Sequence, residues 1–594
     1  MGAMTLDQAF QTAVAHHVYG RLAEAEALYR QILAVQPFHF DALNNLGALL
    51  TGAGKLDEAV AAFQQITRLQ PNAAAAFANL GNLFRDTGRL EEAVMAYRRA
   101  VQINPNLSEA FNGLGSALQL HQEIDEALVA YERAIQLEPA NAMAQSNRGS
   151  ALRALGKVEA AVAAFRAAVQ LRPDAPWARS NLIYALLFHP GPDAGALSAE
   201  LETWDERFGR AASGGDPAFA NDRDPGRRLR VGYVSPNFGD HVVGRNLLPL
   251  FGNHDRRELE IFCYSGAPVA GTLTPEIAAR ADHWRSLYGL DDAAAAALIQ
   301  RDRIDILVDL TQHMADNRLT LFARRPAPVQ VSFAGYPEGT GLRAIGCRLS
   351  DHWLLGEGRE PWDAPWRDIP RHGERVFLID SFWCYEPVAG SPMVNALPAQ
   401  RNGYVTFGSL NQSAKVGNGV LRLWARVMKQ VAGSRLLLMC PRGSRRAEVL
   451  QIFAENEIAA PRIEFAERQA AVSYLELHHC IDVMLDPFPY GGHSTSLDAL
   501  WMGVPVVSLA GASAVSRAGL SQLSNLGLPE LVADSEDDYL TIAVRLASDL
   551  EGLAELRSTL RPRMEASVLM DGVRFARQIE QSYRAMWREW CGGS

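Results

Sequence analysis

The sequence has 594 residues, of which 48% are hydrophobic and 21% are charged. This is the composition of a folded globular protein, and it excludes wholesale disorder or a fibrous fold. The length predicts about four domain-sized units, and the net charge of −10 argues against nucleic acid as the main partner, because phosphate binding requires a basic surface.

The chain shows no sign of a membrane span or a secretory signal. No run of about 20 apolar residues is present to cross a bilayer, and the first residues lack a basic stretch followed by an apolar one. Six cysteines are scattered without CxxC spacing, which favours reduced thiols over a disulfide or zinc framework. We therefore expect a cytoplasmic protein.

The first third of the chain contains five repeats with a period of 34 residues. The period holds for prolines that end helices, for turn glycines and for small residues that let two helices approach closely. These positions are Pro37, Pro71, Pro105, Pro139 and Pro173; Gly20, Gly54, Gly88 and Gly156, with Gln122 in the deviant slot; and Ala25, Ala59, Ala93, Ala127 and Ala161. The residues are those of the tetratricopeptide repeat, which the pattern resembles closely.

A column of asparagines follows the same period and indicates a peptide-binding groove. Asn45, Asn79, Asn147 and Asn181 share one slot, which Gly113 interrupts. An amide both donates and accepts hydrogen bonds, so it can hold the backbone of an extended peptide without reading its side chains. The alternative is that these asparagines only cap or solvate the inner helices.

From residue 183 the pattern predicts a closing helix (183–188), a break, a further helix (196–210) and a linker rich in Gly, Pro and Asp (211–228). Short apolar runs then alternate with helical segments, which favours parallel sheets covered by helices. The predicted strands are 229–235, 259–265, 304–310, 329–335, 403–410, 434–440, 480–486 and 504–510. The predicted domains are a repeat array (4–190), a linker and helix (191–228), an N-terminal catalytic lobe (229–390) and a C-terminal nucleotide-sugar-binding lobe (391–594).

The segment GGHSTSLDALWMGVPVVSLAG (491–511) directly follows a predicted strand and a turn. A helix start preceded by glycines and lined by hydroxyls and backbone N–H groups suits a diphosphate, although Gly followed by Ser and Thr is also an ordinary helix cap. Asp498, early in this helix, suits a ribose hydroxyl or complements the helix dipole.

Four segments in this order, after the repeats, resemble the O-linked N-acetylglucosamine transferase and Spindly family. They are NFGDHVVGRNLLPLF, FARRPAPVQVSFAGYPEGTG, FGSLNQSAKV and PYGGHSTSLDALWMGVPVV. The resemblance implies an α-superhelical repeat array followed by an α/β GT-B fold of two Rossmann-like lobes, with a nucleotide sugar in the cleft. It also implies inverting, metal-free transfer of the sugar to Ser or Thr hydroxyls of proteins.

The resemblance assigns roles to individual residues. Lys415 neutralises charge on the departing diphosphate, and His241 faces the sugar and the acceptor without being established as the base. Donor binding falls to Gln412, Gln469, Tyr474, Tyr490, Gly492, His493, Ser494, Thr495 and Asp498. The sugar or acceptor pocket is expected to include His313, Gly335 and Tyr336.

The sequence departs from this family at several positions. Ala471 replaces a lysine that aids donor binding in the animal enzymes, and Gln300 replaces a second proposed catalytic histidine. Tyr490 stands where the N-acetylglucosamine enzymes have a small cysteine, and its FPYGG context is nearer to Spindly, some members of which transfer fucose from a guanosine donor. Because His493 and Ser494 resemble the N-acetylglucosamine branch more, we favour UDP-N-acetylglucosamine over GDP-fucose and UDP-glucose.

Other classes of function remain open at this stage. A transferase acting on asparagine, lipid or polysaccharide is disfavoured by the asparagine column, and a non-catalytic peptide-binding scaffold is disfavoured by Lys415. The one Asp-x-Asp string, from Asp222 to Asp224, lies in the linker and is expected to form a solvated turn rather than a metal site. We expect no metal or other cofactor; the partners are the nucleotide sugar and protein acceptors.

Overall fold

The computed structural model describes residues 4–189, 191, 194–210, 218–356, 366–368 and 374–592. The chain divides into two compact units, Met1–Ala151 and Leu152–Ser594. This boundary falls inside a repeat helix rather than at residue 190, because the last repeat packs with the catalytic body. In the second unit, the hydroxyl of Ser180 bonds to the ring of His313 (3.0 Å) and accepts from Trp204 Nε1 (3.1 Å).

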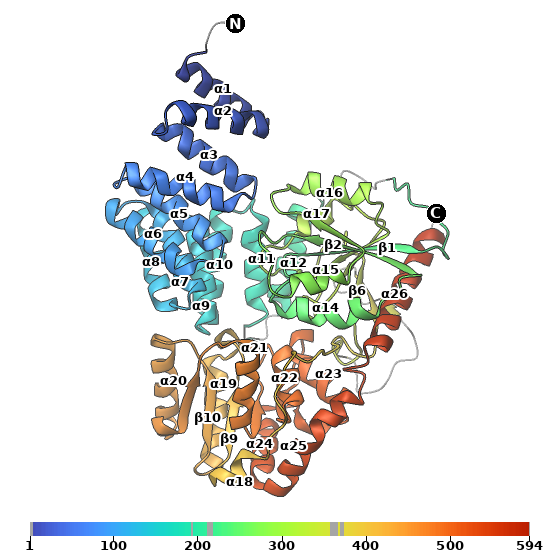
Figure 1. Ribbon diagram of the computed structural model, residues 1–594. Helices are drawn as coiled ribbons and strands as arrows, with labels where there is room; N and C mark the ends of the chain where they lie inside the picture. The colour runs from blue at the N-terminus through green and yellow to red at the C-terminus, as the bar shows by residue number, and fades with distance from the viewer. Residues whose placement is uncertain are drawn as a thin grey trace. The chain divides into compact units, whose positions relative to one another are not determined.

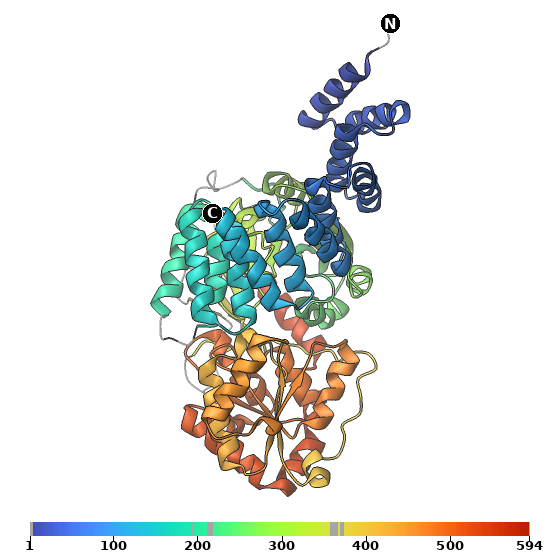
Figure 2. The ribbon, with the colours of Figure 1, turned by 90° about the vertical axis from the view of Figure 1, so that its left-hand side faces the viewer.

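The repeats form pairs of antiparallel helices (Figures 1 and 2). The helices are α1 (Leu6–Val18), α2 (Leu22–Val35), α3 (Phe40–Gly52), α4 (Leu56–Leu69), α5 (Ala74–Asp86), α6 (Leu90–Ile103), α7 (Ser108–Leu120), α8 (Ile124–Leu137), α9 (Ala142–Ala154), α10 (Val158–Leu171) and α11 (Pro176–Leu186). The turn glycines adopt φ between +73° and +76°, and Gln122 takes the same left-handed conformation at φ 70°. The turn is therefore kept in the one repeat that lacks the glycine.

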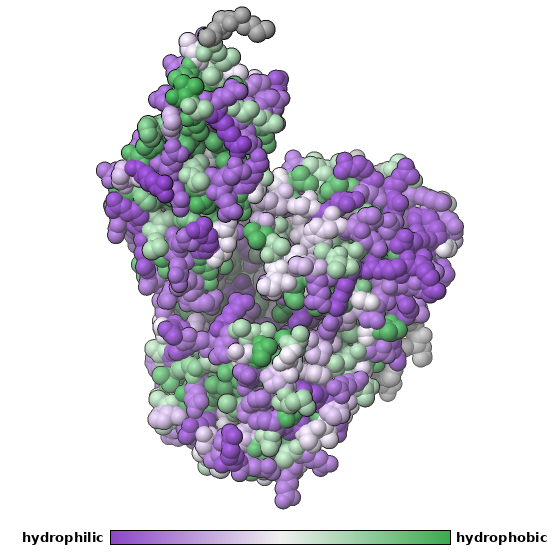
Figure 3. Space-filling view, in the orientation of Figure 1, coloured by the Kyte–Doolittle hydropathy of each residue, from purple (hydrophilic) through white to green (hydrophobic). Residues whose placement is uncertain are grey.

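Exposed apolar side chains occur near the start of the array. Val18, Tyr19, Val35 and Phe38 are each between 67% and 77% exposed. Figure 3 shows the corresponding apolar surface on the first helices, among hydrophilic residues.

After α11 the chain forms α12 (Ala194–Trp204), which continues as a π-helical turn, Asp205–Gly209. This is the helix predicted for residues 196–210. Part of the predicted linker, residues 211–217, lies outside the described residues. Asp222 and Asp224 accept hydrogen bonds from nearby backbone N–H groups, as in a solvated turn.

The first lobe contains a sheet with the strand order β3-β2-β1-β4-β5-β6-β8-β7, in which only the β7–β8 pair is antiparallel. Its strands are β1 (Leu229–Ser235), β2 (Leu259–Ser265), β3 (His283–Ser286), β4 (Ile306–Asp309), β5 (Val329–Ser332), β6 (Cys347–Ser350), β7 (Trp366–Asp368) and β8 (Arg375–Leu378). Its helices are α14 (Val242–Asn253), α15 (Thr274–Ala279), α16 (Asp292–Arg301) and α17 (Leu319–Ala323).

The second lobe has a parallel sheet with the order β11-β10-β9-β12-β13-β14, covered by helices on both faces (Figure 2). Its strands are β9 (Thr406–Ser409), β10 (Arg435–Met439), β11 (Ile463–Ala466), β12 (Val483–Leu485), β13 (Val506–Leu509) and β14 (Val532–Ala533). Its helices are α18 (Pro398–Asn402), α19 (Asn418–Gln430), α20 (Ser444–Glu455), α21 (Ala471–Glu476), α22 (Ser494–Trp501), α23 (Ala518–Asn525), α24 (Glu536–Ser548) and α25 (Leu550–Glu565).

The last helix, α26 (Gly572–Gly592), returns to the first lobe and packs against α14 (Figure 1). Tyr583 donates to the hydroxyl of Tyr233 (3.3 Å), and Glu580 pairs with His254 (3.1 Å). The prediction that residues 391–594 all belong to the second lobe is therefore wrong for this helix. Its amphipathic pattern gives no indication of which lobe it covers. Within the described residues, no helix is long and apolar enough to cross a membrane.

Candidate active site

Most of the predicted donor-binding residues lie beyond the carboxyl ends of β9 and β12; Gln469 and Tyr474 follow β11 instead. Strands β9 and β12 pair in parallel, so the loops that follow them meet at one edge of the sheet. The loop after β9 ends in a 3₁₀ turn, Ser413–Lys415, preceded by the exposed Gln412. The loop after β12 leads through Gly492 to His493 and the start of α22.

Asp486, the residue after β12, holds the glycine loop in place. Its buried carboxylate accepts hydrogen bonds from the Gly492 N–H (2.7 Å), Ser508 Oγ (2.8 Å) and Ser496 Oγ (3.1 Å). A side chain at Gly492 would bring its Cβ to 2.1 Å from Ser496 Oγ, so only glycine fits. Burial raises the pKa of Asp486 to about 6. Sequence reasoning missed this residue, although it directly follows a predicted strand.

Lys415 reaches across to the same loop. Its Nζ donates to the carbonyl oxygen of Gly491 (2.7 Å) and lies 4.3 Å from the centre of the Tyr490 ring. Burial lowers the pKa of Lys415 to about 8, although the carboxylate of Asp486 opposes this shift. The side chain therefore remains mainly charged at pH 7.

His493 stands at the start of α22 with its ring stacked on Tyr490 (centroids 4.9 Å apart). Burial, and then the charge of Lys415, lower the pKa of His493 well below its usual value, so the ring is neutral at pH 7. Its Nε2 is buried and has no partner among the described residues, which leaves that atom available to a bound donor. Ser494, beside it, is the buried first residue of α22.

Tyr490 is buried in a cluster of aromatic rings from three parts of the second unit. Its ring stacks on Phe188, just after the end of α11 (4.5 Å, 13°). Tyr184, one turn earlier in α11, lies 5.3 Å from Phe188 and 5.7 Å from Tyr336 of the first lobe. The structure thus brings the predicted sugar-pocket residues Tyr336 and Tyr490 to one cluster, and adds Tyr184 and Phe188, which sequence reasoning missed.

Gly335 and Tyr336 form a tight loop after β5. The amide of Gln312 accepts from the Tyr336 N–H (2.7 Å), and a Cβ on Gly335 would lie 2.6 Å from the same oxygen. The fit requires glycine at position 335 and fixes the backbone that carries Tyr336.

His313 lies in a different place from the predicted one. It is fully buried, with Nδ1 bonded to Ser180 Oγ (3.0 Å) and Nε2 donating to the Thr340 carbonyl (2.8 Å). Both ring nitrogens are therefore used by protein groups, and burial lowers its pKa to about 4. The expectation that His313 faces the cleft is wrong: the residue joins α11 to the first lobe.

His241 stands before α14 and caps it, since its Nδ1 accepts from the Val243 N–H (3.2 Å). The surrounding protein, and then the guanidinium of Arg468, lower its pKa, so the ring is neutral at pH 7. A neutral ring whose Nδ1 accepts carries its proton on Nε2. His241 is thereby set to donate a hydrogen bond through Nε2 rather than to accept a proton there.

The predicted nucleoside residues lie near α21 and α22. The side chain of Tyr474 hydrogen-bonds to that of Thr495, and Gln469 lies exposed in the loop between β11 and α21. Asp498 is buried, accepts from the Tyr385 hydroxyl (2.8 Å) and is ion-paired with Arg245. Neither Tyr385 nor Arg245 gave a signal in the sequence.

Asn411 is a further polar residue at this edge that sequence reasoning missed. It is fully buried, and neither Nδ2 nor Oδ1 has a partner among the described residues. Its Oδ1 lies 3.3 Å from the position that a Cβ on Gly492 would take. Its place next to Gln412, directly after a predicted strand, was the available signal.

The asparagine column lies half-buried on the first helix of its repeats. Tyr29 hydrogen-bonds to Asn45, and Asn147 donates to Asn112 (2.9 Å), the residue before the interrupting Gly113. The ring of Tyr97 explains the interruption, because a Cβ at position 113 would lie 2.3 Å from it.

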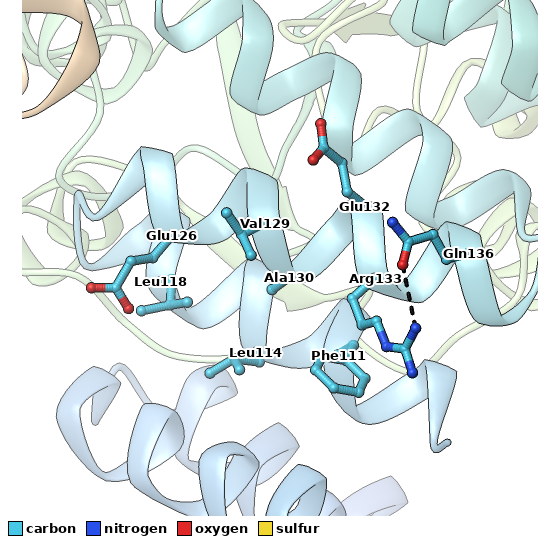
Figure 4. Close-up of a pocket in the computed structure, with 9 residues that line it drawn as sticks. All are labelled: Phe111, Leu114, Leu118, Glu126, Val129, Ala130, Glu132, Arg133 and Gln136. Atoms are coloured by element: carbon cyan, nitrogen blue, oxygen red, sulfur yellow. Dashed lines mark hydrogen bonds between the residues drawn. The ribbon is translucent and has the colours of Figure 1, made fainter. Parts of the chain in front are cut away.

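A surface pocket of about 500 Å³ lies between α7 and α8 of the array, apart from the asparagine column (Figure 4). Phe111, Leu114 and Leu118 line it from α7, and Arg133, bonded to Gln136 (3.3 Å), borders it from α8. None of the predicted site residues lines this pocket. Among the described residues, no group of His, Cys, Asp or Glu is placed to hold a metal ion.

Comparisons with known proteins agree with this geometry. The model of glycosyl transferase family 41 matches residues 216–352 and 394–579, and the tetratricopeptide repeat model matches residues 19–67, 50–108 and 112–176. A mutant of the Thermobaculum terrenum O-GlcNAc transferase superposes with a TM-score of 0.80 at 35% identity, covering 87% of this chain and 98% of that one. The fold is therefore GT-B, with two Rossmann-like lobes after the repeats.

Curated relatives match somewhat less than two thirds of this chain. The probable UDP-N-acetylglucosamine–peptide N-acetylglucosaminyltransferase SPINDLY of Petunia hybrida is 35% identical over 384 residues, which are 63% of this chain and 40% of that protein. A UDP-N-acetylglucosamine–peptide N-acetylglucosaminyltransferase of Caenorhabditis elegans is 24% identical over 476 residues, covering 62% and 41% of the two chains. The chain thus spans about 40% of the length of the plant relatives it matches. Because the family model covers more than half of the sequence, this chain belongs to glycosyl transferase family 41.

Proposed function

We propose that this chain is an inverting protein O-glycosyltransferase that transfers a sugar, in the first place N-acetylglucosamine from UDP-N-acetylglucosamine, to Ser or Thr hydroxyls. The observation that carries the proposal is the position of the Lys415 ammonium, 2.7 Å from the Gly491 carbonyl and beside the start of α22. A fixed cation and a helix N-terminus together suit a diphosphate that gains charge as it leaves.

In the proposed reaction, a Ser or Thr oxygen attacks the anomeric carbon of the sugar from the face opposite the diphosphate. The bond from the anomeric carbon to the β-phosphate oxygen breaks, the nucleoside diphosphate leaves with the electron pair, and the sugar linkage is inverted. Lys415 and the backbone N–H groups at the start of α22 stabilise the leaving group, and His493 contacts it.

The hydroxyl proton goes to a phosphate oxygen of the donor in this proposal. His241 is a poor acceptor, because its Nδ1 is already used by the Val243 N–H and its Nε2 carries the proton. We therefore assign His241 to hydrogen-bond donation toward the sugar or acceptor. The proposed reaction uses no metal, since Lys415 and α22 supply the positive charge that a divalent cation provides in other transferases.

We further propose that protein acceptors lie along the asparagine column, as the amide chemistry of Asn45, Asn79, Asn147 and Asn181 suggests. No nucleic acid or membrane partner is proposed. The cytoplasmic location stays a prediction from the cysteine pattern.

Fucose from GDP-fucose, or glucose from UDP-glucose, is the second candidate. It is favoured by Tyr490, whose ring is fixed between Phe188 and His493 and takes up space in the predicted sugar pocket. An N-acetyl group needs more room than a hydroxyl.

The test is to incubate the protein separately with UDP-N-acetylglucosamine, UDP-glucose and GDP-fucose, and to measure release of the nucleoside diphosphate with and without excess EDTA. We expect turnover of the first donor, unchanged by EDTA. Turnover of none of the three, together with equal UDP binding by the parent protein and its Lys415→Ala variant, would support a non-catalytic scaffold instead.

A further inference from the structure

The carboxylate of Asp498 is held by side chains from outside its own lobe. Arg245, on α14 of the first lobe, forms an ion pair with Oδ1 of Asp498 on α22 (both helices are labelled in Figure 1). Tyr385, in the chain segment that connects the lobes, donates its hydroxyl to the same oxygen at 2.8 Å. Both interactions are made by Oδ1 of Asp498, so Oδ2 can accept a hydrogen bond from another group.

The ion pair is largely removed from water. The side chains of Arg245 and Asp498 are 19% and 5% exposed. The guanidinium of Arg245 lies over the ring of Tyr385, 5.1 Å from its centre. A buried ion pair contributes little net stability compared with apolar side chains, because both charges lose their hydration. Stabilisation of the contact between the lobes therefore does not by itself explain why a charged pair, rather than two apolar side chains, occupies this position.

The surroundings of the pair point to a nucleoside. Tyr474, whose aromatic ring suits a base, interacts electrostatically with both Asp498 and Arg245 and hydrogen-bonds to Thr495. Thr495 lies at the start of α22, where we place the diphosphate. Asp498 thus lies on the helix whose start we assign to the phosphates and close to the ring that we assign to the base, as a group that binds a ribose should.

We propose that Arg245 is a positioning residue for ribose recognition: by holding Oδ1 of Asp498 from the opposite lobe, it directs Oδ2 at the ribose hydroxyls of the donor. The inference rests on the proposed function, and it adds that the nucleotide site is complete only when both lobes are together. It predicts that any preference of the site for a ribonucleotide over its 2′-deoxy counterpart depends on Arg245 acting through Asp498.

The test compares binding of UDP and 2′-deoxy-UDP, and of GDP and 2′-deoxy-GDP, by titration calorimetry. For the parent protein we expect the ribonucleotide to bind at least about tenfold more tightly, the typical effect of one hydrogen bond to a charged group. In Arg245→Ala the ratio of the two affinities, ribonucleotide over deoxyribonucleotide, should fall close to one, because Asp498 is no longer held. Arg245→Lys keeps the charge and should restore part of the ratio.

Two further variants separate positioning from a general effect on the fold. Asp498→Ala should lose the ribose preference as well, and the double variant Arg245→Ala, Asp498→Ala should lose nothing more, because Arg245 acts through Asp498. Arg257→Ala is the matched control, since Arg257 is an exposed first-lobe arginine paired with Asp255. If Arg245→Ala folds poorly, Tyr385→Phe removes only one hydroxyl and should lower the ratio.

The outcomes are distinct. If the parent protein binds neither UDP nor GDP, the proposed function fails and this inference fails with it. If the parent prefers ribonucleotides and folded Arg245→Ala keeps that preference in full, or binds nucleotides more tightly, only the role of Arg245 is overturned.

Discussion

At the scale of single residues, burial sets the charges of the candidate site. It lowers the pKa of Lys415 to about 8 and raises that of Asp486 to about 6, and it keeps His493 neutral. At pH 7 the site therefore presents one ammonium toward the proposed leaving group, with a neutral imidazole beside it. This arrangement favours a transition state in which the diphosphate gains negative charge.

Replacing Lys415 with Met should remove that charge while keeping most of the side-chain volume. We expect kcat to fall at least about a hundredfold, the typical cost of losing one stabilising group for a developing charge, while UDP still binds. Steady-state kinetics and calorimetry measure the two effects. Lys429→Met, on an exposed lysine paired with Glu457, is the control. A Lys415→Met variant with normal kcat would remove the lysine from the mechanism.

The activity should also fall at high pH. The pKa of Lys415 is lowered to about 8, so its charge is present below that pH and is lost as the pH rises through it. Because kcat/KM reports the free enzyme, we expect kcat/KM to decline above about pH 8, and kcat to decline only at higher pH, where the bound diphosphate no longer keeps the lysine protonated. Lys415→Arg should move the decline in kcat/KM upward. A profile that rises through pH 8 and 9 would contradict a cationic Lys415.

Residue roles could be predicted only where a motif carries them. Lys415 stands in the motif after β9, and Gly492 and His493 stand in the motif after β12; the two motifs are far apart in the sequence, but their strands are neighbours in the sheet. Arg245 and Phe188 reach the site from distant segments, and nothing in their local sequence signals those contacts. His313 was misplaced because a histidine after a strand end looks the same whether its ring nitrogens face a cleft or, as here, bond to Ser180 and Thr340.

At the scale of elements, the loop from Asp486 to His493 is the part of the proposed site that tolerates substitution least. A Cβ at Gly492 would lie 2.1 Å from Ser496 Oγ and 2.6 Å from Asp486 Oδ1. Gly492→Ala should displace this loop and weaken donor binding at least about tenfold, since backbone groups that face the diphosphate would move.

Isothermal titration with UDP checks this expectation. Gly419→Ala is the matched control, because nothing lies within 4 Å of a Cβ there. Unchanged UDP binding in a folded Gly492→Ala variant would show that the loop is not part of the donor site.

The asparagine column is the element through which we expect acceptors to bind. Replacing Asn45, Asn79, Asn147 and Asn181 together with Ala should raise KM for protein acceptors and leave hydrolysis of the donor unchanged, because the amides contact only the peptide backbone. Equal loss of both activities, with a lower melting temperature, would indicate a folding defect instead and would contradict the groove.

The predicted strands coincide with β1, β2, β4, β5, β9, β10, β12 and β13, whereas β3, β6, β7, β8, β11 and β14 were not predicted. β1 and β2 are buried at every position but one, and the central residues of β10 are buried, as expected for strands covered on both faces. β3 (His283–Ser286) is a short edge strand of polar residues, and β11 lies at the edge of the second sheet with Glu464 exposed. Edge strands need less apolar surface, so periodicity did not reveal them.

At the scale of the whole molecule, the family match, the two sheets and the repeats describe a chain in which a tetratricopeptide array precedes a GT-B glycosyltransferase fold. The last repeat helix, α11, contributes Tyr184 to the aromatic cluster around Tyr490, and the turn that follows it contributes Phe188. The division of the chain at residue 151 was not predictable, because the repeat period continues unchanged across it.

The most direct test of the central proposal is mass spectrometry of lysate proteins after incubation with the protein and UDP-N-acetylglucosamine, with the Lys415→Met variant as the parallel sample. We predict N-acetylhexosamine on Ser or Thr residues, in the β linkage that inversion requires, and its absence with the variant. Modification of asparagine instead, or no modified hydroxyl with this donor, UDP-glucose or GDP-fucose, would contradict protein O-glycosyl transfer.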